Sequence, residues 1–396
     1  MPTSTLSQSP AAPTERVSNA TDGLRCRPTP FERIARDAWD RLYAESASAN
    51  PFARWTFHRA WWDAYGSTAH EQYLVCADDS SEIRGIVPLM HRHEEEPEDE
   101  RTATVLRRLS RQGTHVRADA KAIFFGASYH ADYATLLCAP DDLESTAMAM
   151  VESLAAPPHE GHGDQPWDVV DLRRLRTRDP AVAALEAAFG LVRANRGWEV
   201  VREVEDVCPV VTVEAGAGWD DYLASLGKKA RHEIRRKLRR AQAAGGLSVE
   251  LAAPTAKAVD EFIALHQKRF GDEGLFPPTE GGERSRQFVK RLAELELAEG
   301  ESGQLQVAQV RSGERLIFSA LAFDDGQTCY FYNAGMDPDA AELSPGITGT
   351  AEYLRDRIEA GRRRFDFMRG SEPYKYEWGA RDELIERLLV LRGAGA

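Results

Sequence analysis

The stretch 304–368 constrains the fold most, because it sets strands, turns and one helix in a fixed order. Three apolar runs are separated by two turn-forming pairs, in the order 304–310, Ser312-Gly313, 316–323, Asp325-Gly326 and 328–333. A helical pattern then covers about 346–360, ends at Gly361 and leads into a short strand at 364–368. Strands joined by a helical crossover lie parallel, so strands 328–333 and 364–368 should be parallel neighbours. The order predicts an α/β fold with mixed sheets.

The rest of the chain divides into a polar tail and two units. Residues 1–28 are polar and read as a disordered tail, and the pattern restarts near residue 205. Residues 29–204 place strands, a helix, a strand and a helix in an order that loosely echoes residues 205–396. A chain of 396 residues is long enough for two domains. We therefore predict two tandem units of similar fold, 29–204 and 205–396, which bury each other within a monomer.

The composition of the chain limits which binding partners and which cellular compartment are expected. The formal net charge of −13 argues against general binding to DNA or to anionic membranes. No apolar run approaches the roughly 20 residues that span a bilayer, and the N-terminus lacks a secretory pattern, so neither membrane insertion nor export is expected. The five cysteines are dispersed, which predicts a reducing, cytoplasmic compartment in which most of them are small buried apolar residues. No metal-ligand spacing is present, and no metal is expected.

The first candidate site is the helix start Leu343-Ser-Pro-Gly-Ile-Thr-Gly349. The first amides of a helix have no internal partner, so they can donate to an anion. Gly346 and Gly349 keep the backbone open, while Ser344 and Thr348 add hydroxyls. The alternative interpretation is a plain Pro-Gly turn that only starts a helix.

The second candidate site is the segment Phe365-Asp-Phe-Met-Arg-Gly-Ser-Glu-Pro-Tyr-Lys-Tyr-Glu-Trp-Gly379. Lys375 would supply a positive charge, Tyr374 a proton or a hydrogen bond, and Trp378 part of the substrate surface. Asp366 points away from its apolar neighbours, and if buried it needs a partner, for which Arg369 is the candidate. The alternative is a surface loop anchored by aromatic side chains.

Two further features concern charge and titration. Helix 219–244, which Gly227 divides, carries a basic run that includes Arg235 and Arg239. This run is either a groove for a polyanionic substrate or a solvated helix face. His266, on the helix capped by Thr255, titrates near neutral pH and is a candidate general base, or else a packing residue.

The segment from Phe365 to Gly379 resembles the BioF-like acetyltransferase domain of the GNAT superfamily, found in proteins of bacterial cellulose and exopolysaccharide synthesis. Fem-type aminoacyltransferases, built from two GNAT-like units, are its structural relatives. Asn50-Pro-Phe52, Trp61-Trp62 and Asp132-Tyr133 are similar to the N-terminal unit of such proteins. The resemblance spans roughly residues 30–392.

The resemblance implies two tandem GNAT-like units, acetyl-CoA or another acyl-CoA as co-substrate, and a site on strand 328–333. That strand would splay from its parallel neighbour and receive the pantetheine arm, beside Phe331 and with Asn333 near the substrate. The acceptor would be a small or nucleotide-linked intracellular precursor, such as a sugar nucleotide or polysaccharide intermediate. The chain departs from the usual pattern, since no Arg precedes Gly346, so aminoacyl-tRNA is an alternative donor. A non-catalytic scaffold in exopolysaccharide synthesis is the remaining alternative.

Overall fold

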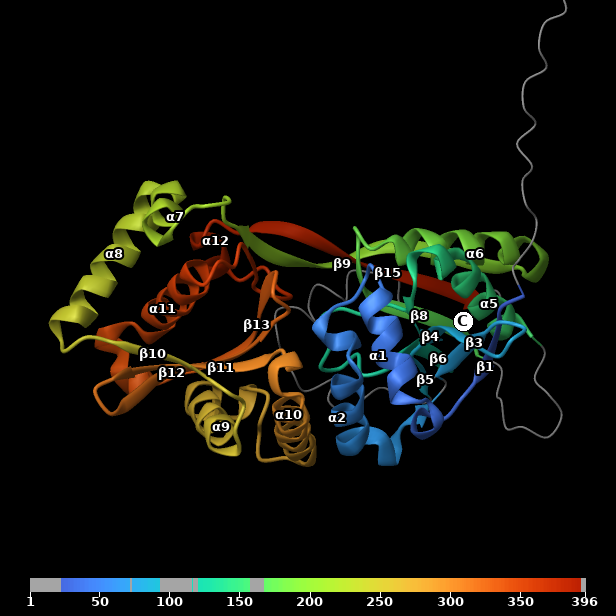
Figure 1. The fold of residues 1–396 in the computed structure, drawn as a ribbon, viewed down its shortest axis with the longest axis horizontal. Helices are drawn as coiled ribbons and strands as arrows, with labels where there is room; N and C mark the ends of the chain where they lie inside the picture. Colours follow the sequence, from blue (N-terminus) through green and yellow to red (C-terminus); the bar gives the residue numbers. More distant parts are fainter. Residues whose placement is uncertain (1–22, 72, 93–115, 117–119, 157–166, 393–396) are drawn as a thin grey trace, which may run out of the picture.

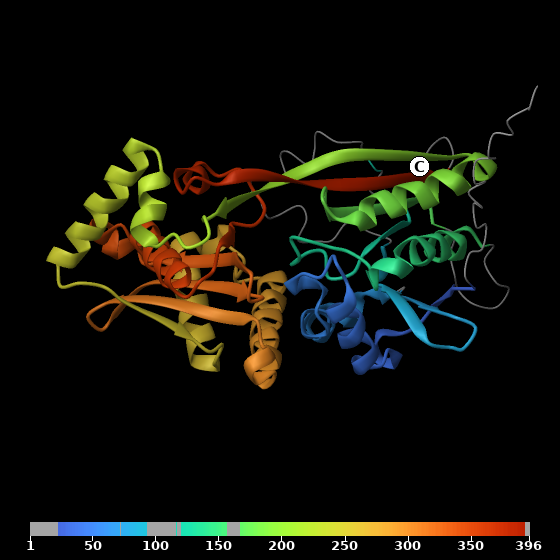
Figure 2. The same ribbon diagram turned by 45° about the horizontal axis from the view of Figure 1, so that its top comes forward.

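Two α/β lobes lie side by side along the long axis of the molecule, joined by two long strands. The structure is a computed structural model that describes residues 23–71, 73–92, 116, 120–156 and 167–392. Strands β9 (Trp198–Thr212) and β15 (Arg381–Arg392) run from one lobe into the other, as Figures 1 and 2 show.

The N-terminal lobe contains β1 (Arg25–Pro28), α1 (Arg36–Glu45), α2 (Trp55–Tyr65), β2 (His70–Glu71), β3 (Leu74–Ala77), β4 (Ile83–Val87), β5 (Leu89–Arg92), β6 (Ala122–Phe125), β7 (Leu137–Cys138), α5 (Leu143–Ala155), β8 (Val169–Arg176) and α6 (Pro180–Arg196). The C-terminal lobe contains α7 (Trp219–Ser225), α8 (Lys228–Ala243), β10 (Ser248–Ala252), α9 (Ala256–Phe270), α10 (Glu280–Ala298), β11 (Leu305–Ser312), β12 (Arg315–Asp324), β13 (Thr328–Met336), α11 (Pro345–Glu359), β14 (Arg364–Asp366) and α12 (Pro373–Glu377).

One sheet of eleven strands runs through both lobes. Its order is β10-β11-β12-β13-β14-β9-β15-β8-β6-β5-β2, and β1-β3-β4-β7 form a separate small sheet. β9 and β15 pair antiparallel from Val210 and Arg381 to Trp198 and Arg392. β14 joins one end of β9, whereas β8 joins β15. The predicted division after residue 204 therefore falls inside β9, and the last strand of the chain completes the sheet of the first lobe.

The local predictions about the C-terminal lobe are confirmed. β11, β12 and β13 form an antiparallel meander, and β13 pairs parallel with β14 across the α11 crossover. Gly227 separates α7 from α8, and the Thr255 hydroxyl accepts the amide of Ala258 at the start of α9. In the N-terminal lobe, β6 and β8 also pair parallel around α5, so the expected echo between the two halves is real.

Three expectations from the sequence are wrong. Residues 25–28 are not a disordered tail, because β1 pairs with β3; residues 1–22 lie outside the described part. Cys26 and Cys76 stand opposite each other in that pair and are joined by a disulfide, which the sequence did not predict, whereas the other three cysteines are buried and free, as predicted for most of the five. Residues 373–377 form the short helix α12 rather than a loop.

An apolar core fills the junction between the lobes. Phe52 and Phe57 from the first lobe pack with Phe288 and Phe323 from the second, at ring-centroid distances of 5.2 Å for Phe57–Phe288 and 5.7 Å for Phe52–Phe323. Helices α2 and α10 face each other across this junction (Figure 1). Because burial of each such ring stabilises by about 1.5–3 kcal/mol, this core fixes the lobes against each other.

Candidate active site

The parallel strands β13 and β14 diverge after three paired residues. They pair only from Thr328 to Tyr330, opposite 364–366. Beyond Asp366 the chain follows β9 instead, since the amides of Phe367 and Gly370 donate to carbonyls of β9 at 3.0 and 2.9 Å. β13 meanwhile continues along β12 to Met336. Residues 331–336 thus present a backbone edge that β14 does not cover, and we use the name strand opening for the place where the backbones of 331–336 and 367–370 diverge.

A bulge in β13 changes which side chains face this opening. The register between β12 and β13 shifts at Leu321/Ala322, and Tyr332 is left without a partner in β12. Ala334 and Met336 pack with Phe331 on the α11 side, while a Cβ at Gly335 would lie 2.5 Å from the backbone of His266 on α9. By alternation, Asn333 lies on the α9 side, opposite Phe331. Strict alternation predicts that the two share a face, and the bulge makes that prediction wrong.

Asn333 and Phe331 consequently have different surroundings. The Asn333 amide is half-buried and makes no hydrogen bond to any described residue, so it is free to bind a substrate. Phe331 is buried in the core against Phe318, Tyr353 and Phe367. Phe331 can therefore support the strand, but it does not expose a face to a ligand.

The first turn of α11 lies beside the end of β13. Ser344 adopts a left-handed conformation, with φ of 53°, and begins the helix before Pro345. Gly346 is half-buried, and a Cβ there would lie 3.0 Å from the terminal carbon of Met336. The guanidinium of Arg240, on α8, donates to the Ser344 hydroxyl at 2.7 Å. A cation that the local motif lacks is thus supplied by a helix distant in sequence.

Thr348 and Gly349 face the protein interior. The Thr348 hydroxyl is buried and donates to the carbonyls of Leu343 and Ser344 at 3.1 and 3.2 Å. A Cβ at Gly349 would lie 2.2 Å from the Phe318 ring, so this glycine allows α11 to approach β12 closely. Of the four predicted anion-binding residues, only Ser344 and Gly346 are placed to meet a ligand.

Lys375 closes the loop that borders the strand opening. Its buried ammonium donates to the carbonyls of Met368, Arg369 and Gly370 at 3.0, 2.7 and 3.1 Å, and it lies 2.9 Å from the Glu372 carboxylate. Three donors have three carbonyl partners, and none remains for a substrate. The geometry favours a structural role for Lys375 over the predicted catalytic one.

Asp366 and Arg369 do not pair with each other, contrary to the expectation from sequence. Asp366 is buried and accepts hydrogen bonds from the Tyr133 hydroxyl at 2.7 Å and the Met368 amide at 2.9 Å. Burial raises the pKa of the Asp366 carboxyl above its usual value. The Arg369 guanidinium instead donates to Asp132 at 2.7 Å. Both partners belong to the N-terminal lobe, so neither predicted substrate-binding residue is free.

Tyr374 and Trp378 differ in exposure. Tyr374 is 46% exposed, its ring lies 6.4 Å from that of Phe367, and its hydroxyl has no hydrogen-bond partner among the described residues. Trp378 is buried in the core, and its carbonyl accepts the Tyr222 hydroxyl at 2.7 Å. Tyr374 is available for chemistry at the rim of the strand opening, whereas Trp378 anchors α12.

His266 is sealed inside the C-terminal lobe. It is buried among Phe262, Phe270 and Phe276, and its Nδ1 has no hydrogen-bond partner among the described residues. Burial lowers the pKa of His266 to about 4, so the imidazole is neutral at pH 7. Its backbone touches β13 at Gly335, but its ring serves the packing of α9.

The basic helix α8 exposes the cations that the sequence singles out. Arg235 is half-exposed and only 3.9 Å from Asp220, and Arg239 is exposed without an ion pair to any described residue. Arg240 belongs to the same basic run, but its contact with Ser344 was not predicted from the sequence, because that contact depends on α8 packing against α11. Asp132 and Tyr133 stood out only through their resemblance to an N-terminal unit.

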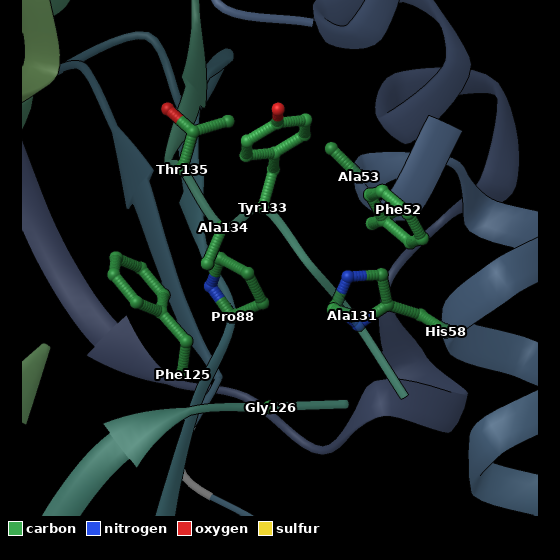
Figure 3. A pocket seen from close by; sticks show the side chains of 10 residues that line it. All are labelled: Phe52, Ala53, His58, Pro88, Phe125, Gly126, Ala131, Tyr133, Ala134 and Thr135. Atoms are coloured by element: carbon green, nitrogen blue, oxygen red, sulfur yellow. The ribbon is translucent and has the colours of Figure 1, made fainter. Parts of the chain in front are cut away.

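A small cavity in the N-terminal lobe is too small for a substrate. Figure 3 shows it between Phe52, His58, Phe125 and Tyr133. Its volume of about 10 Å³ holds about one water molecule. The Nδ1 of His58 lies 2.9 Å from the Tyr73 hydroxyl, so this ring nitrogen already has a partner.

Among the described residues no group of His, Cys, Asp and Glu could hold a metal ion. None of the described helices is long and apolar enough to cross a membrane.

Comparisons with known proteins concern the family of one domain and the fold of the chain. Residues 228–376 match the family model described as an acetyltransferase (GNAT) domain. No curated protein matches the chain. Among solved structures, FemX is similar with a TM-score of 0.54 and 10% identity, over 90% of this chain and 96% of that one. A conserved protein of unknown function from Bacteroides thetaiotaomicron VPI-5482 gives a TM-score of 0.53 and 13% identity, over 90% and 98%. These two likenesses concern the fold alone.

Proposed function

We propose that the chain is an acyltransferase that transfers an acyl group, acetyl from acetyl-CoA in the first instance, to an amine or hydroxyl. The match of residues 228–376 to an acetyltransferase (GNAT) domain supports this proposal. The strand opening beside the first turn of α11 is the observation that carries this proposal. The pantetheine arm would lie along the free edge of β13, with the phosphates at Gly346, Ser344 and Arg240. The amides of Ile347 and Thr348 already donate to the Ser344 carbonyl and Pro345 has no amide hydrogen, so the Gly346 amide and the Arg240 guanidinium are the donors proposed for a phosphate.

Direct transfer is the mechanism that these residues support. The acceptor attacks the thioester carbonyl, and a backbone amide of β13 stabilises the oxyanion. Tyr374, exposed at the rim, is the candidate donor of a proton to the leaving thiolate, and the proton that the acceptor loses to solvent would restore the Tyr374 hydroxyl. An acyl-cysteine intermediate is not proposed, because Cys329 is fully buried and burial raises the pKa of its thiol to about 12.

The donor is assigned to the C-terminal lobe rather than to its counterpart. In the N-terminal lobe α5 occupies the crossover that corresponds to α11, between parallel β6 and β8. Its start carries Asp141, Asp142 and Glu144, which would repel a phosphate. We therefore propose one donor site per chain.

Calorimetric binding tests the donor. We expect acetyl-CoA to bind, and Arg240→Gln to weaken that binding about tenfold, since a hydrogen bond to a charged group contributes about 1.5–3 kcal/mol. S-acetylpantetheine, which lacks the phosphates, should bind the variant and the unchanged protein equally. Arg236→Gln is the matched control, because Arg236 lies on the same helix but pairs with Glu233.

Two results would contradict the proposal. If neither acetyl-CoA nor a longer acyl-CoA binds the unchanged protein, an acyl-CoA donor is excluded. If Arg240→Gln weakens the pantetheine thioester as much as the coenzyme A thioester, the phosphates do not lie at α11. Because segment 365–379 resembles the BioF-like acetyltransferase domain, sugar nucleotides and polysaccharide precursors are the acceptors to screen first. These acceptors and acyl-CoA would place the reaction in the cytoplasm.

Aminoacyl-tRNA is the second candidate donor, and the exposed cations of α8 favour it. Arg235 and Arg239 stand on the helix that also delivers Arg240 to the α11 turn. A tRNA would bind with strong salt dependence, and the triple change Arg235→Ala, Arg236→Ala and Arg239→Ala should abolish it. Salt-insensitive binding, or binding that survives this change, would exclude this candidate.

A further inference from the structure

Residues 130–133 of the N-terminal lobe form hydrogen bonds to residues on both sides of the strand opening. On the β13 side, the Tyr332 hydroxyl donates to the carbonyl of His130 at 2.8 Å. On the opposite side, the Tyr133 hydroxyl donates to Asp366 at 2.7 Å, and Asp132 accepts from Arg369 at 2.7 Å. One short segment thus connects the two strands at the place where they stop pairing with each other.

This segment is itself held firmly. The His130 ring is buried, lies 4.1 Å from the Phe288 ring of α10 in a stacked arrangement, and its Nε2 is 2.8 Å from the Tyr65 hydroxyl of α2. Tyr133 and Asp366 are each 2% exposed, so their hydrogen bond is shielded from water. The segment therefore joins the core between the lobes to the rim of the strand opening.

The turn at residues 366–370, to which this segment is bonded, contains a strained backbone conformation. Met368 has a φ of 61°, a left-handed conformation that costs a non-glycine residue about 1–3 kcal/mol. The Met368 amide donates to Asp366, whose other oxygen accepts the Tyr133 hydroxyl. Tyr133 and Lys375 thereby fix the same turn from two directions.

We propose that Asp132 and Tyr133 are positioning residues for acyl transfer, and that they set the separation between β13 and residues 367–370. This inference rests on the proposed function, because it takes the strand opening as the place of the thioester. A misplacement of about 1 Å can cost on the order of 10²-fold in rate. The N-terminal lobe would then control the reaction geometry without contributing a second active site.

The test uses the full chain with the changes Tyr133→Phe and Asp132→Asn, singly and together. We expect kcat of the double variant, measured as release of coenzyme A from acetyl-CoA with an acceptor found by the screen above, or with water where the screen finds none, to fall at least tenfold. The Kd for free coenzyme A should change less than threefold, because the phosphates bind at α11. Hydrogen exchange in the ligand-free protein should become faster in peptides covering 331–336 and 366–370.

Arg54→Gln is the matched control for a contact between the lobes that lies elsewhere. Arg54 pairs with buried Glu296 at 3.0 Å, and neither residue belongs to the strand opening. We expect this variant to lose stability but to keep its kcat within about twofold. An equal loss of kcat in Arg54→Gln would mean that any contact between the lobes affects the rate. Asp132 and Tyr133 would then have no specific positioning role, and the inference would be overturned.

The two proposals fail differently. Unchanged protein that binds no acyl-CoA overturns the proposed function, and unchanged exchange at 366–370 in the double variant overturns the positioning role whether or not a donor binds. Binding of acyl-CoA with wild-type kcat in the double variant leaves the function standing and removes the inference.

Discussion

Single residues show how burial changes the chemistry that their identity suggests. Burial lowers the pKa of His58 and His130 to about 3 and that of His266 to about 4, while the unfolded value is about 6.5. All three are neutral in the folded protein at pH 7. Between pH 6.5 and the lower pKa of the folded state, each of these histidines is protonated in the unfolded chain and neutral in the folded protein. The free energy of unfolding must therefore fall as the pH falls through this range.

This argument predicts acid sensitivity that one substitution reduces. From pH 7.5 to pH 5, each buried histidine should cost on the order of 2 kcal/mol of the free energy of unfolding. His266→Leu should reduce that loss by about this amount, measured by urea unfolding at both pH values, whereas exposed His232→Leu should not. A pH dependence unchanged in His266→Leu would mean that His266 is already protonated or solvated when folded.

Lys375 and Tyr374 are neighbours in sequence, but Lys375 holds the loop together whereas Tyr374 is exposed and available for chemistry. Lys375→Met leaves three carbonyls and Glu372 without their cation and should lower the free energy of unfolding by about 3 kcal/mol. Tyr374→Phe should leave stability within about 0.5 kcal/mol and lower kcat, because its hydroxyl bonds to none of the residues that the structure describes. Lys375→Met with wild-type stability but no activity would restore the catalytic role that the sequence suggests.

At the scale of elements, local patterns were predictable and contacts between distant elements were not. The meander β11–β13, the α11 crossover and the break at Gly227 follow from turn residues and periodicity within a few positions. The β13 bulge, the pairing of β1 and the approach of Arg240 to Ser344 depend on packing across the chain. The same limit applies to Gly349, whose local motif suggests an anion site.

Gly346 and Gly349 on α11 should therefore respond differently to substitution by alanine. Gly349→Ala places a methyl group 2.2 Å from the Phe318 ring and should destabilise by about 1–3 kcal/mol, with partial recovery in combination with Phe318→Leu. Gly346→Ala meets only the flexible end of Met336 and should fold normally. Urea unfolding measures both, and a Gly349→Ala variant as stable as the unchanged protein would show that α11 does not pack as described.

At the scale of the whole molecule, the two lobes share one eleven-stranded sheet, so we expect them to unfold cooperatively. β9 pairs with β15 from Trp198 to Val210, over the whole of β15, and residues late in β15 belong to the core of the N-terminal lobe. A repeat of similar order along the chain predicts two units, but it does not reveal that the last strand returns to the first unit. That return is a long-range pairing without a local signature.

This sharing of strands predicts a single unfolding transition for both lobes. Leu388 of β15 is fully buried beside Leu172 in the N-terminal core. Leu388→Ala should lower the free energy of unfolding by about 2–5 kcal/mol and shift the signals of both lobes together. Leu384→Ala, on the same strand but 40% exposed, is the control and should shift neither by more than about 0.5 kcal/mol. Hydrogen exchange in denaturant, followed in peptides from α6 and from α11, reports each lobe separately. Two transitions, of which Leu388→Ala moves only the one in α6, would show that the lobes unfold independently despite their common sheet.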